Sequence, residues 1–217
     1  MAQPDIRIDL VSDTVCPWCL IGKRRLERAV AQRRDLAVEV RWRAFQLHPD
    51  MPPEGADKAA FVARKFGSAE KARDIYRQIA DVGRAEGLTF RFDRIDRAPN
   101  TLDSHRLILW SASAGCQDAV VEGLFEAYFT AGQDISDPGV LAGVAADAGM
   151  DKALVADLLA SDRDRERVLA EDKAARQMGI QGVPCLIVNR RLMVQGAQEP
   201  ETLIQAMDQA LAPAGEV

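Results

Sequence analysis

Cysteine and long hydrophobic runs are scarce in this 217-residue sequence. Four cysteines are too few and too scattered for the disulfide framework of a secreted protein of this length. Charged residues interrupt every apolar stretch before it reaches the roughly 20 residues that cross a bilayer. The N-terminal segment, broken by Asp5, Arg7 and Asp9, has no continuous apolar region of a secretory signal. We therefore expect a soluble, cytoplasmic protein without a membrane partner.

An excess of positive charge is also missing. The chain has 28 Lys and Arg against 33 Asp and Glu, a formal net charge of −5, which argues against a nucleic-acid partner held by bulk charge. Its 47% hydrophobic and 28% charged residues are typical of a globular chain and give no indication of disorder. At this length a core can form without structural metal or disulfides. The composition favours one large domain, or one domain with an insertion.

The N-terminal part of the sequence has the pattern of an α/β unit. Alternation of apolar and polar residues predicts a strand over residues 5–11 and another over about 37–44. Between them, from Pro17 to about Arg34, the apolar spacing becomes helical, and Pro17 suits the first helical position. The order is strand, helix, strand.

After Pro53 the apolar period is helical for about a hundred residues, which predicts an all-helical insert. Period two then returns in Gly182–Val188 and Leu192–Gln195, a hairpin around a turn at Asn189-Arg190. Glu199-Pro200 opens a last helix. The expected fold class is α/β, ordered βαβ, helical insert, ββα. Residues 1–55 and 180–217 would form one domain, and 56–179 a helical insertion domain with its connecting helix.

The sequence Cys16-Pro17-Trp18-Cys19 lies where the first strand meets the helix. Two thiols three positions apart on one helical turn can approach to disulfide distance. Unpaired N–H groups and the positive end of the helix dipole favour the thiolate of Cys16, which we expect to be the more exposed nucleophile. Cys19, one turn further in, should lie deeper and resolve a mixed disulfide. This pattern predicts thiol–disulfide exchange.

Half of a zinc site is the alternative interpretation of Cys-x-x-Cys. A closed zinc site needs four ligands, and no second Cys-x-x-Cys or closely spaced histidine pair supplies them. We therefore expect no metal. Tightly bound metal and no disulfide under oxidant would instead indicate a redox-inert module.

A disulfide exchanger must also hold a substrate backbone beside its sulfurs. The natural candidate is Gly182-Val183-Pro184, which precedes the hairpin. A cis bond before Pro184 would leave the backbone of Val183 free to pair with a peptide. An ordinary trans proline at the start of a strand is the alternative, since only about 5–6% of X-Pro bonds are cis.

Several motifs together resemble the thioredoxin-fold DsbA superfamily, and within it the cytoplasmic FrnE-like branch. The resemblance runs nearly end to end and rests on Asp13-x-x-Cys16-Pro17-Trp18-Cys19-x-Ile21-Gly22, Phe45-x-Leu47-x-Pro49, Pro99-Asn100-Thr101-x-x-x-His105-Arg106, Gly182-Val183-Pro184 and Gly196-Ala197-Gln198. It implies a thioredoxin-like domain interrupted by a helical domain. It also implies Cys16 as nucleophile, Cys19 as resolving thiol, Pro184 as a facing cis proline, and no dissociable cofactor. The sequence departs from the family at Cys185, where a bulky apolar residue is common.

Other residues have weaker functional interpretations. Trp18, between the thiols, should cover the disulfide and contact substrate, together with Val183 and Pro184. Pro17, His105 and Cys185 are accessory candidates. For His105 a packing role outweighs a proton shuttle, because nothing local pairs with it, and for Cys185 a core role outweighs a third reactive thiol.

The remaining candidates are Cys116 and a basic cluster on the first helix. Cys116 should be structural. The basic cluster could supply charge to a thiolate or to a glutathione carboxylate, but such runs are usually solvated helix faces. Its members are Lys23, Arg24, Arg25 and Arg28.

The sequence thus predicts an enzyme, a thiol–disulfide oxidoreductase or disulfide isomerase acting on a disulfide-containing protein or a small thiol. Glutathione is a possible co-substrate. The alternative is a glutathione-dependent small-molecule isomerase or transferase, similar to hydroxychromene-carboxylate isomerase and kappa-class glutathione transferase. Those relatives typically have serine at the position of Cys16, so the dithiol favours the first interpretation. Substrate, reduction potential and oligomeric state do not follow from the sequence.

Overall fold

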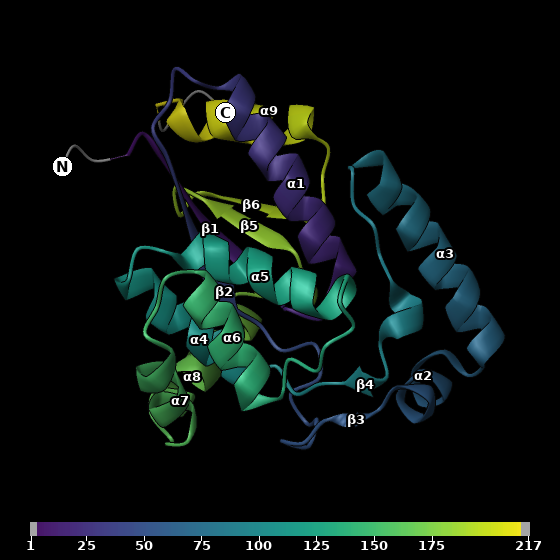
Figure 1. Ribbon diagram of the computed structural model, residues 1–217. Coiled ribbons are helices and arrows are strands. Elements are labelled where there is room, and N and C mark those ends of the chain that lie inside the picture. The colour runs from purple at the N-terminus through teal and green to yellow at the C-terminus, as the bar shows by residue number, and fades with distance from the viewer. Residues whose placement is uncertain (1–3, 214–217) are drawn as a thin grey trace.

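A mixed four-stranded sheet organises the computed structural model, which describes residues 4–213 (Figure 1). Its strands are β1 (Ile6–Ser12), β2 (Val38–Ala44), β5 (Cys185–Val188) and β6 (Leu192–Gln195), in the order β2-β1-β5-β6. β1 pairs parallel with β2 and antiparallel with β5, which pairs antiparallel with β6. Helices α1 (Pro17–Gln32) and α9 (Pro200–Leu211) lie on one side of the sheet. The predicted βαβ and ββα units are confirmed.

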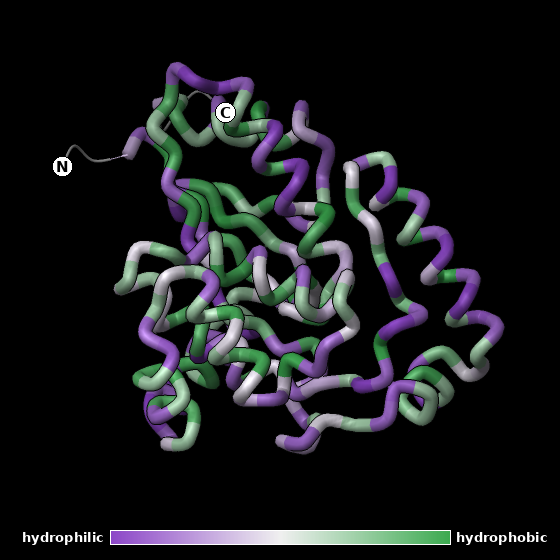
Figure 2. The backbone as a smooth tube through the Cα atoms, in the orientation of Figure 1, coloured by the Kyte–Doolittle hydropathy of each residue, from purple (hydrophilic) through white to green (hydrophobic). Residues whose placement is uncertain are grey.

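β1 is an interior strand of the sheet, with β2 on one edge and β5 on the other. Ile6, Ile8 and Leu10 alternate along it and are buried, as their period-two spacing predicts. The β5–β6 hairpin is largely hydrophobic, whereas α3 alternates between hydrophilic and hydrophobic residues (Figure 2). Burial of the central strand places its C-terminal end, and therefore the thiols that follow, on a rigid support.

The β5–β6 hairpin turns where the sequence predicts it. Asn189 and Arg190 have φ angles of 49° and 57°, the left-handed conformation that the two central residues of a type I′ turn adopt. The side-chain oxygen of Asn189 accepts a hydrogen bond of 2.7 Å from the backbone N–H of Arg7. This contact ties the turn to the beginning of β1.

Helices account for most of the insert. They are α2 (Lys58–Phe66), α3 (Ala69–Ala85), α4 (Leu102–Ser113), α5 (Gln117–Phe129), α6 (Pro138–Asp147), α7 (Lys152–Leu159) and α8 (Arg165–Gln177). The expectation of helix throughout is wrong in one place. β3 (Ala56–Asp57) pairs antiparallel with β4 (Arg97–Ala98). A 3₁₀ turn at Phe92–Arg94 precedes β4. Strands of two residues are too short to show a period of their own.

Side chains from the insert protect the exposed edge of β2. The N–H of Trp42 donates to the side-chain oxygen of Gln117 at 3.0 Å, and that of Ala44 to a carboxylate oxygen of Glu171 at 3.2 Å. Just beyond the strand, the N–H of Gln46 donates to Asp172 at 2.8 Å. An unprotected strand edge can pair with another chain, and these contacts occupy the edge of β2 instead. They also hold α5 and α8 against the sheet.

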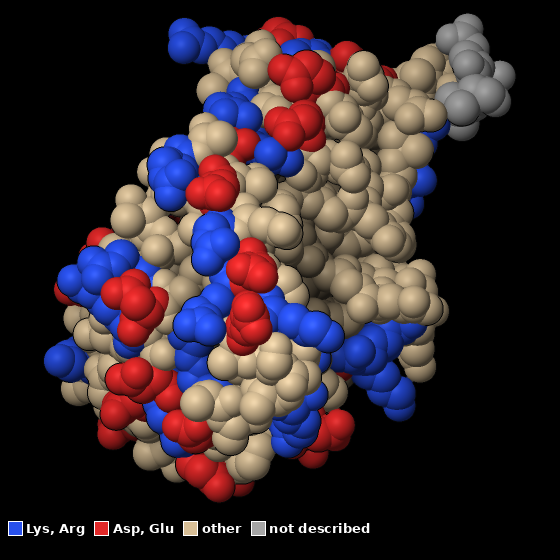
Figure 3. Space-filling view, turned by 90° about the vertical axis from the view of Figure 1, so that its right-hand side faces the viewer, with Lys and Arg blue, Asp and Glu red and all other residues tan. Residues whose placement is uncertain are grey.

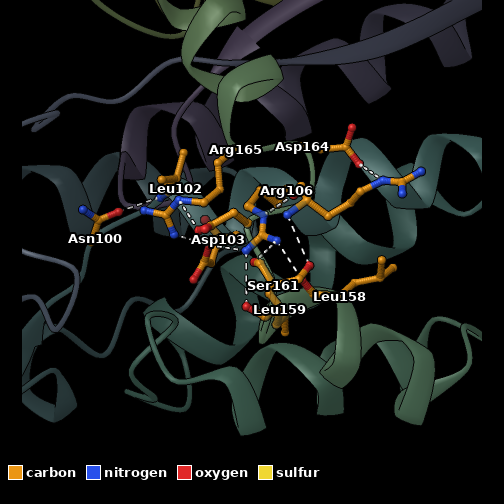
Figure 4. A network of polar contacts seen from close by, with 12 residues as sticks. Asn100, Leu102, Asp103, Arg106, Leu158, Leu159, Ser161, Asp164 and Arg165 are labelled. Carbon is orange, nitrogen blue, oxygen red and sulfur yellow. Dashed lines mark hydrogen bonds and ion pairs between the residues drawn. The ribbon is translucent and has the colours of Figure 1, made fainter.

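Arg106 fastens the far part of the insert (Figure 4). Its fully buried guanidinium donates to the carbonyls of Leu158, Ser161 and Arg163 at 2.7, 2.7 and 2.8 Å, and contacts Asp103 at 2.8 Å. These carbonyls belong to the end of α7 and the loop that follows it, where helical acceptors have no partner within the helix. The network is structural and holds α7 against α4.

Among residues 4–213, every helix is too short or too polar to cross a bilayer.

Candidate active site

The paired cysteines occupy the first turn of α1. Cys16 is the N-cap residue, with an extended backbone and no side-chain capping bond, and Pro17 begins the helix. The N–H of Cys19 donates to the carbonyl of Cys16 at 3.0 Å. Both thiols are free, with Cys16 5% exposed and Cys19 fully buried. The structure thus gives the two sulfurs the unequal exposure that the sequence predicts, although Cys16 itself is largely covered.

Cys19 lies where its charged form is costly. Burial raises the pKa of the Cys19 thiol well above its usual range, and a hydrogen bond with Cys16 and the charge of Cys16 raise it further. Hydrogen bonds from the Ser12 side chain and the Asp13 backbone oppose this shift only in part. At neutral pH the inner sulfur therefore carries its proton, and its nucleophilic form appears when that proton is removed.

The segment before β5 faces the outer sulfur. The Cys16 thiol lies 3.5 Å from the carbonyl oxygen of Val183, and the Val183–Pro184 bond is cis, as the family resemblance implies. Gly22 allows Pro184 to pack on α1, since a Cβ there would meet Pro184 Cγ at 3.0 Å. The N–H of Gly196 donates to the carbonyl of Pro184 at 2.8 Å. Residues distant in sequence thus meet around one sulfur.

Trp18 is exposed next to the thiols. Its side chain keeps 39% of its surface accessible, a large apolar area for a residue on a helix turn. The sequence predicts this exposure, because core packing would not place an aromatic residue at that turn. Trp18 is therefore available to whatever approaches Cys16.

His105 has a partner that the local sequence does not reveal. Its Nε2 lies 3.3 Å from Oδ1 of Asp13 and 3.1 Å from the carbonyl of Phe45. Asp13 is fully buried, and its other carboxylate oxygen accepts from the N–H of Leu47 at 2.7 Å. The N–H of Cys16 in turn donates to the carbonyl of Asp13 at 3.0 Å. His105 thus supports the loop that carries the nucleophile, through contacts with Asp13 and with the backbone of Phe45.

The other two cysteines lie outside the pair. Cys185 is fully buried on β5 opposite Val11, and burial raises the pKa of its thiol to about 11. Cys116 is half-buried at the N-cap of α5, with its sulfur 3.8 Å from the carbonyl of Ser111. In residues 4–213 no group of three or more His, Cys, Asp or Glu is placed to hold a metal ion.

The basic cluster on α1 pairs with acidic side chains, most of them from distant segments. Lys23 is buried and pairs with Glu27, Asp118 and Glu122, the last two on α5. Arg24 also pairs with Glu122. The interpretation as a solvated helix face is wrong for Lys23, because its partners come from distant segments that local spacing cannot reveal. Supply of charge to a thiolate or to a glutathione carboxylate stays a prediction.

Arg25 and Arg28, the other two members, share Glu86 at the end of α3. Seen from the side of α3, basic and acidic side chains are interspersed, and beside them lies a hollowed surface with few charges (Figure 3). Ion pairs of these α1 cations with Glu86 therefore hold the end of α3 against α1.

A different cation lies near the thiols. Nζ of Lys65, on α2, is 3.2 Å from Nε2 of His48. Burial lowers the pKa of Lys65, and the negative charges of Cys16 and Asp13 act in the opposite direction. Burial and the neighbouring Lys65 lower the pKa of His48. No sequence pattern singles out Lys65, since its helix lies about forty positions beyond the cysteines along the chain.

A dithiol on the first turn of a helix, next to the central strand and facing a cis proline, defines a thioredoxin-fold thiol–disulfide oxidoreductase. Comparison with known proteins identifies the family. The model of the DSBA-like thioredoxin domain family matches residues 7–208, and the chain belongs to that family.

Several known proteins are similar to this chain. A "probable DsbA oxidoreductase" from Streptomyces coelicolor is 31% identical, with a TM-score of 0.88 over 98% of this chain and 92% of that one. The cytosolic disulfide reductase DsbM from Pseudomonas aeruginosa, with glutathione, shares the fold at 18% identity, with a TM-score of 0.62 over 94% and 95% of the two chains. Protein YwbO of Bacillus subtilis is 24% identical over 148 residues, 68% of each chain. The predicted α/β fold with a helical insertion, and the oxidoreductase class, are confirmed.

Proposed function

We propose that the protein reduces or isomerises disulfides of peptide and protein substrates in the cytoplasm, as a member of the FrnE-like branch, with the Cys16–Cys19 dithiol as its only redox group. One observation carries the proposal. The outer sulfur lies at a helix N-terminus within 3.5 Å of a backbone carbonyl, while the inner sulfur is buried beneath it. The likeness to a cytosolic reductase with glutathione supports the reducing direction and a small thiol as the reductant.

The reaction has two exchange steps. The Cys16 thiolate attacks one sulfur of the substrate disulfide, that S–S bond breaks, and the departing substrate sulfur takes up a proton. Cys19 then loses its proton and attacks the Cys16 sulfur of the mixed disulfide, which releases the second substrate thiolate. The substrate gains two electrons and two protons, and the enzyme is left with a Cys16–Cys19 disulfide. Two molecules of a small thiol such as glutathione would restore the dithiol and leave as their own disulfide.

The substrate would lie across Trp18 and the segment before β5. Trp18 offers an exposed apolar face, and Val183 offers backbone groups beside the reacting sulfur. A peptide in extended conformation can pair with such backbone groups independently of its sequence, so we propose Trp18, Val183 and Pro184 as the substrate contacts. Pro17 and the Asp13–His105 pair would act only by supporting the turn that carries Cys16.

A redox titration of the dithiol against glutathione tests the function, together with insulin reduction. We expect insulin reduction by the wild-type protein, none by Cys16→Ser, and unchanged reduction by the matched control Cys116→Ser. A potential near about −270 mV would support a reductant, and one near −120 mV would show an oxidant. Full turnover of a glutathione-activated small molecule by Cys19→Ser would favour the glutathione-dependent isomerase or transferase instead.

A further inference from the structure

Arg25 joins three segments through one side chain. It lies on α1 beyond the thiols, and its side chain is only 13% exposed. Its Nε contacts Glu86 at 2.7 Å, at the end of α3. Its Nη1 donates to the carbonyl of Ala197 at 2.6 Å, and its Nη2 lies 2.7 Å from a carboxylate oxygen of Glu199. The last two contacts hold the loop between β6 and α9.

That loop is tied directly to the segment facing Cys16. Gly196, next to Ala197, donates its N–H to the carbonyl of Pro184 at 2.8 Å. An added Cβ at Gly22 would lie 3.0 Å from Pro184 and 3.6 Å from Ala197, so both segments rest on the same turn of α1. Arg25 is on the following turn of this helix. The loop 196–199 is therefore linked through Pro184 to Val183, whose carbonyl lies beside Cys16.

We propose that Arg25 is a positioning residue for peptide disulfide exchange, which fixes the loop 196–199 on α1 so that the Val183 backbone is presented to a bound peptide beside Cys16. The inference rests on the proposed function. A planar guanidinium can make all three contacts at once, and charge-assisted bonds in a largely buried setting are stronger than neutral ones. Arg25 touches neither sulfur. Its effect should therefore appear in peptide binding and leave the nucleophile unchanged.

The chain offers a matched control in Arg28. This residue lies on the same helix and contacts the same carboxylate, with Nη1 2.8 Å from Glu86. Among the described residues its ion pair is with Glu86, and the loop 196–199 is held by Arg25. Arg25→Met and Arg28→Met therefore both remove a cation from Glu86, but only the first releases the loop.

The experiment compares these variants with two disulfides of different size. The first probe is a self-quenched peptide closed by one disulfide, and the second is dithiobis(nitrobenzoic acid), which has no peptide backbone. For Arg25→Met we expect KM for the peptide to rise about tenfold, the effect of losing charge-assisted hydrogen bonds, with kcat and the small-disulfide rate within about twofold. Arg28→Met should leave all three near the wild-type values.

Equal effects of Arg25→Met and Arg28→Met, or a parallel fall with both probes, would overturn the inference. Glu199→Gln gives a second test if Arg25→Met folds poorly, because Glu199 is exposed and its loss weakens one loop contact only. Its peptide KM should rise by a smaller factor, and an unchanged KM would count against the proposal. A wild-type protein that reduces neither probe would contradict the proposed function itself.

Discussion

Two cysteines in this molecule occupy the same position on two helices. Cys16 is the N-cap residue of α1 and Cys116 of α5, and neither makes a capping bond through its side chain. Cys16 is followed two positions later by Trp18 and three later by a second thiol, and its helix has no acid in the first turn. Cys116 is followed two positions later by Asp118, and α5 contains no second thiol. A helix N-terminus is therefore common to both, and the neighbouring side chains distinguish them.

Exposure alone would rank the two cysteines the other way. Cys116 is half-buried, whereas Cys16 is buried apart from 5% of its surface. On electrostatic grounds we expect Cys16 to be the more reactive, because no acid in the first turn of α1 opposes the positive end of the helix. A comparison of the reaction rates of Cys16 and Cys116 therefore tests whether electrostatics or solvent access controls the reactivity of a cysteine in this protein.

Replacing Cys19 and Cys116 by serine, one at a time, should give the largest difference in turnover. We expect Cys19→Ser to accumulate a covalent complex between Cys16 and substrate, because the thiol that resolves it is gone, with steady-state turnover reduced more than about a hundredfold. Cys116→Ser should form no complex and keep wild-type turnover. Non-reducing gels and mass spectrometry would detect the trapped species, and a complex through Cys116 would contradict the assignment.

The second step should depend on pH because Cys19 is buried. The raised pKa of Cys19 keeps it protonated at neutral pH, so its thiolate fraction increases as pH rises toward that pKa. Release of the second substrate thiol should accelerate roughly tenfold per pH unit above neutrality when proton loss limits the step. Single-turnover quenching from pH 7 to 9 would measure it. A flat profile would show that Cys19 is deprotonated by another route or is not the resolving thiol.

An acid at the position of Trp18 should make α1 more like α5. Trp18→Asp places a carboxylate two residues after Cys16, where like charge opposes the thiolate. We expect alkylation of Cys16 by iodoacetamide to slow by about three- to tenfold, as for a local electrostatic term of roughly 1 kcal/mol. Trp18→Asn controls for loss of the indole. Equal rates in the two variants would mean that charge at this turn has little effect.

The converse change on α5 should have the smallest effect. Asp118→Asn removes the first-turn acid beside Cys116, but Lys23 already lies 3.1 Å from that carboxylate and offsets part of its charge. Alkylation of Cys116 should therefore rise by no more than about twofold. A larger rise would indicate that Lys23 offsets less of the charge than this geometry suggests.

The parts predicted from sequence depend on short-range patterns. Alternation located β1 and β2, proline and its preceding acid marked the start of α6, and the Cys-x-x-Cys spacing identified the thiols. The parts that were missed depend on partners far apart in the chain. Asp13 meets His105 across the loop after β2, and the cations of α1 pair with acids of α3 and α5. A single sequence does not show which charged residues that are far apart in the chain form ion pairs.

The most direct test alkylates Cys16 and Cys116 together in the reduced protein. Sub-stoichiometric iodoacetamide at pH 7, followed by peptide mass spectrometry, gives the ratio of the two rates under identical conditions. We expect Cys16 to react at least about tenfold faster, because thiolate population controls the rate. Equal rates, or faster reaction at the more exposed Cys116, would contradict the claim that the first turn of α1 activates its cysteine.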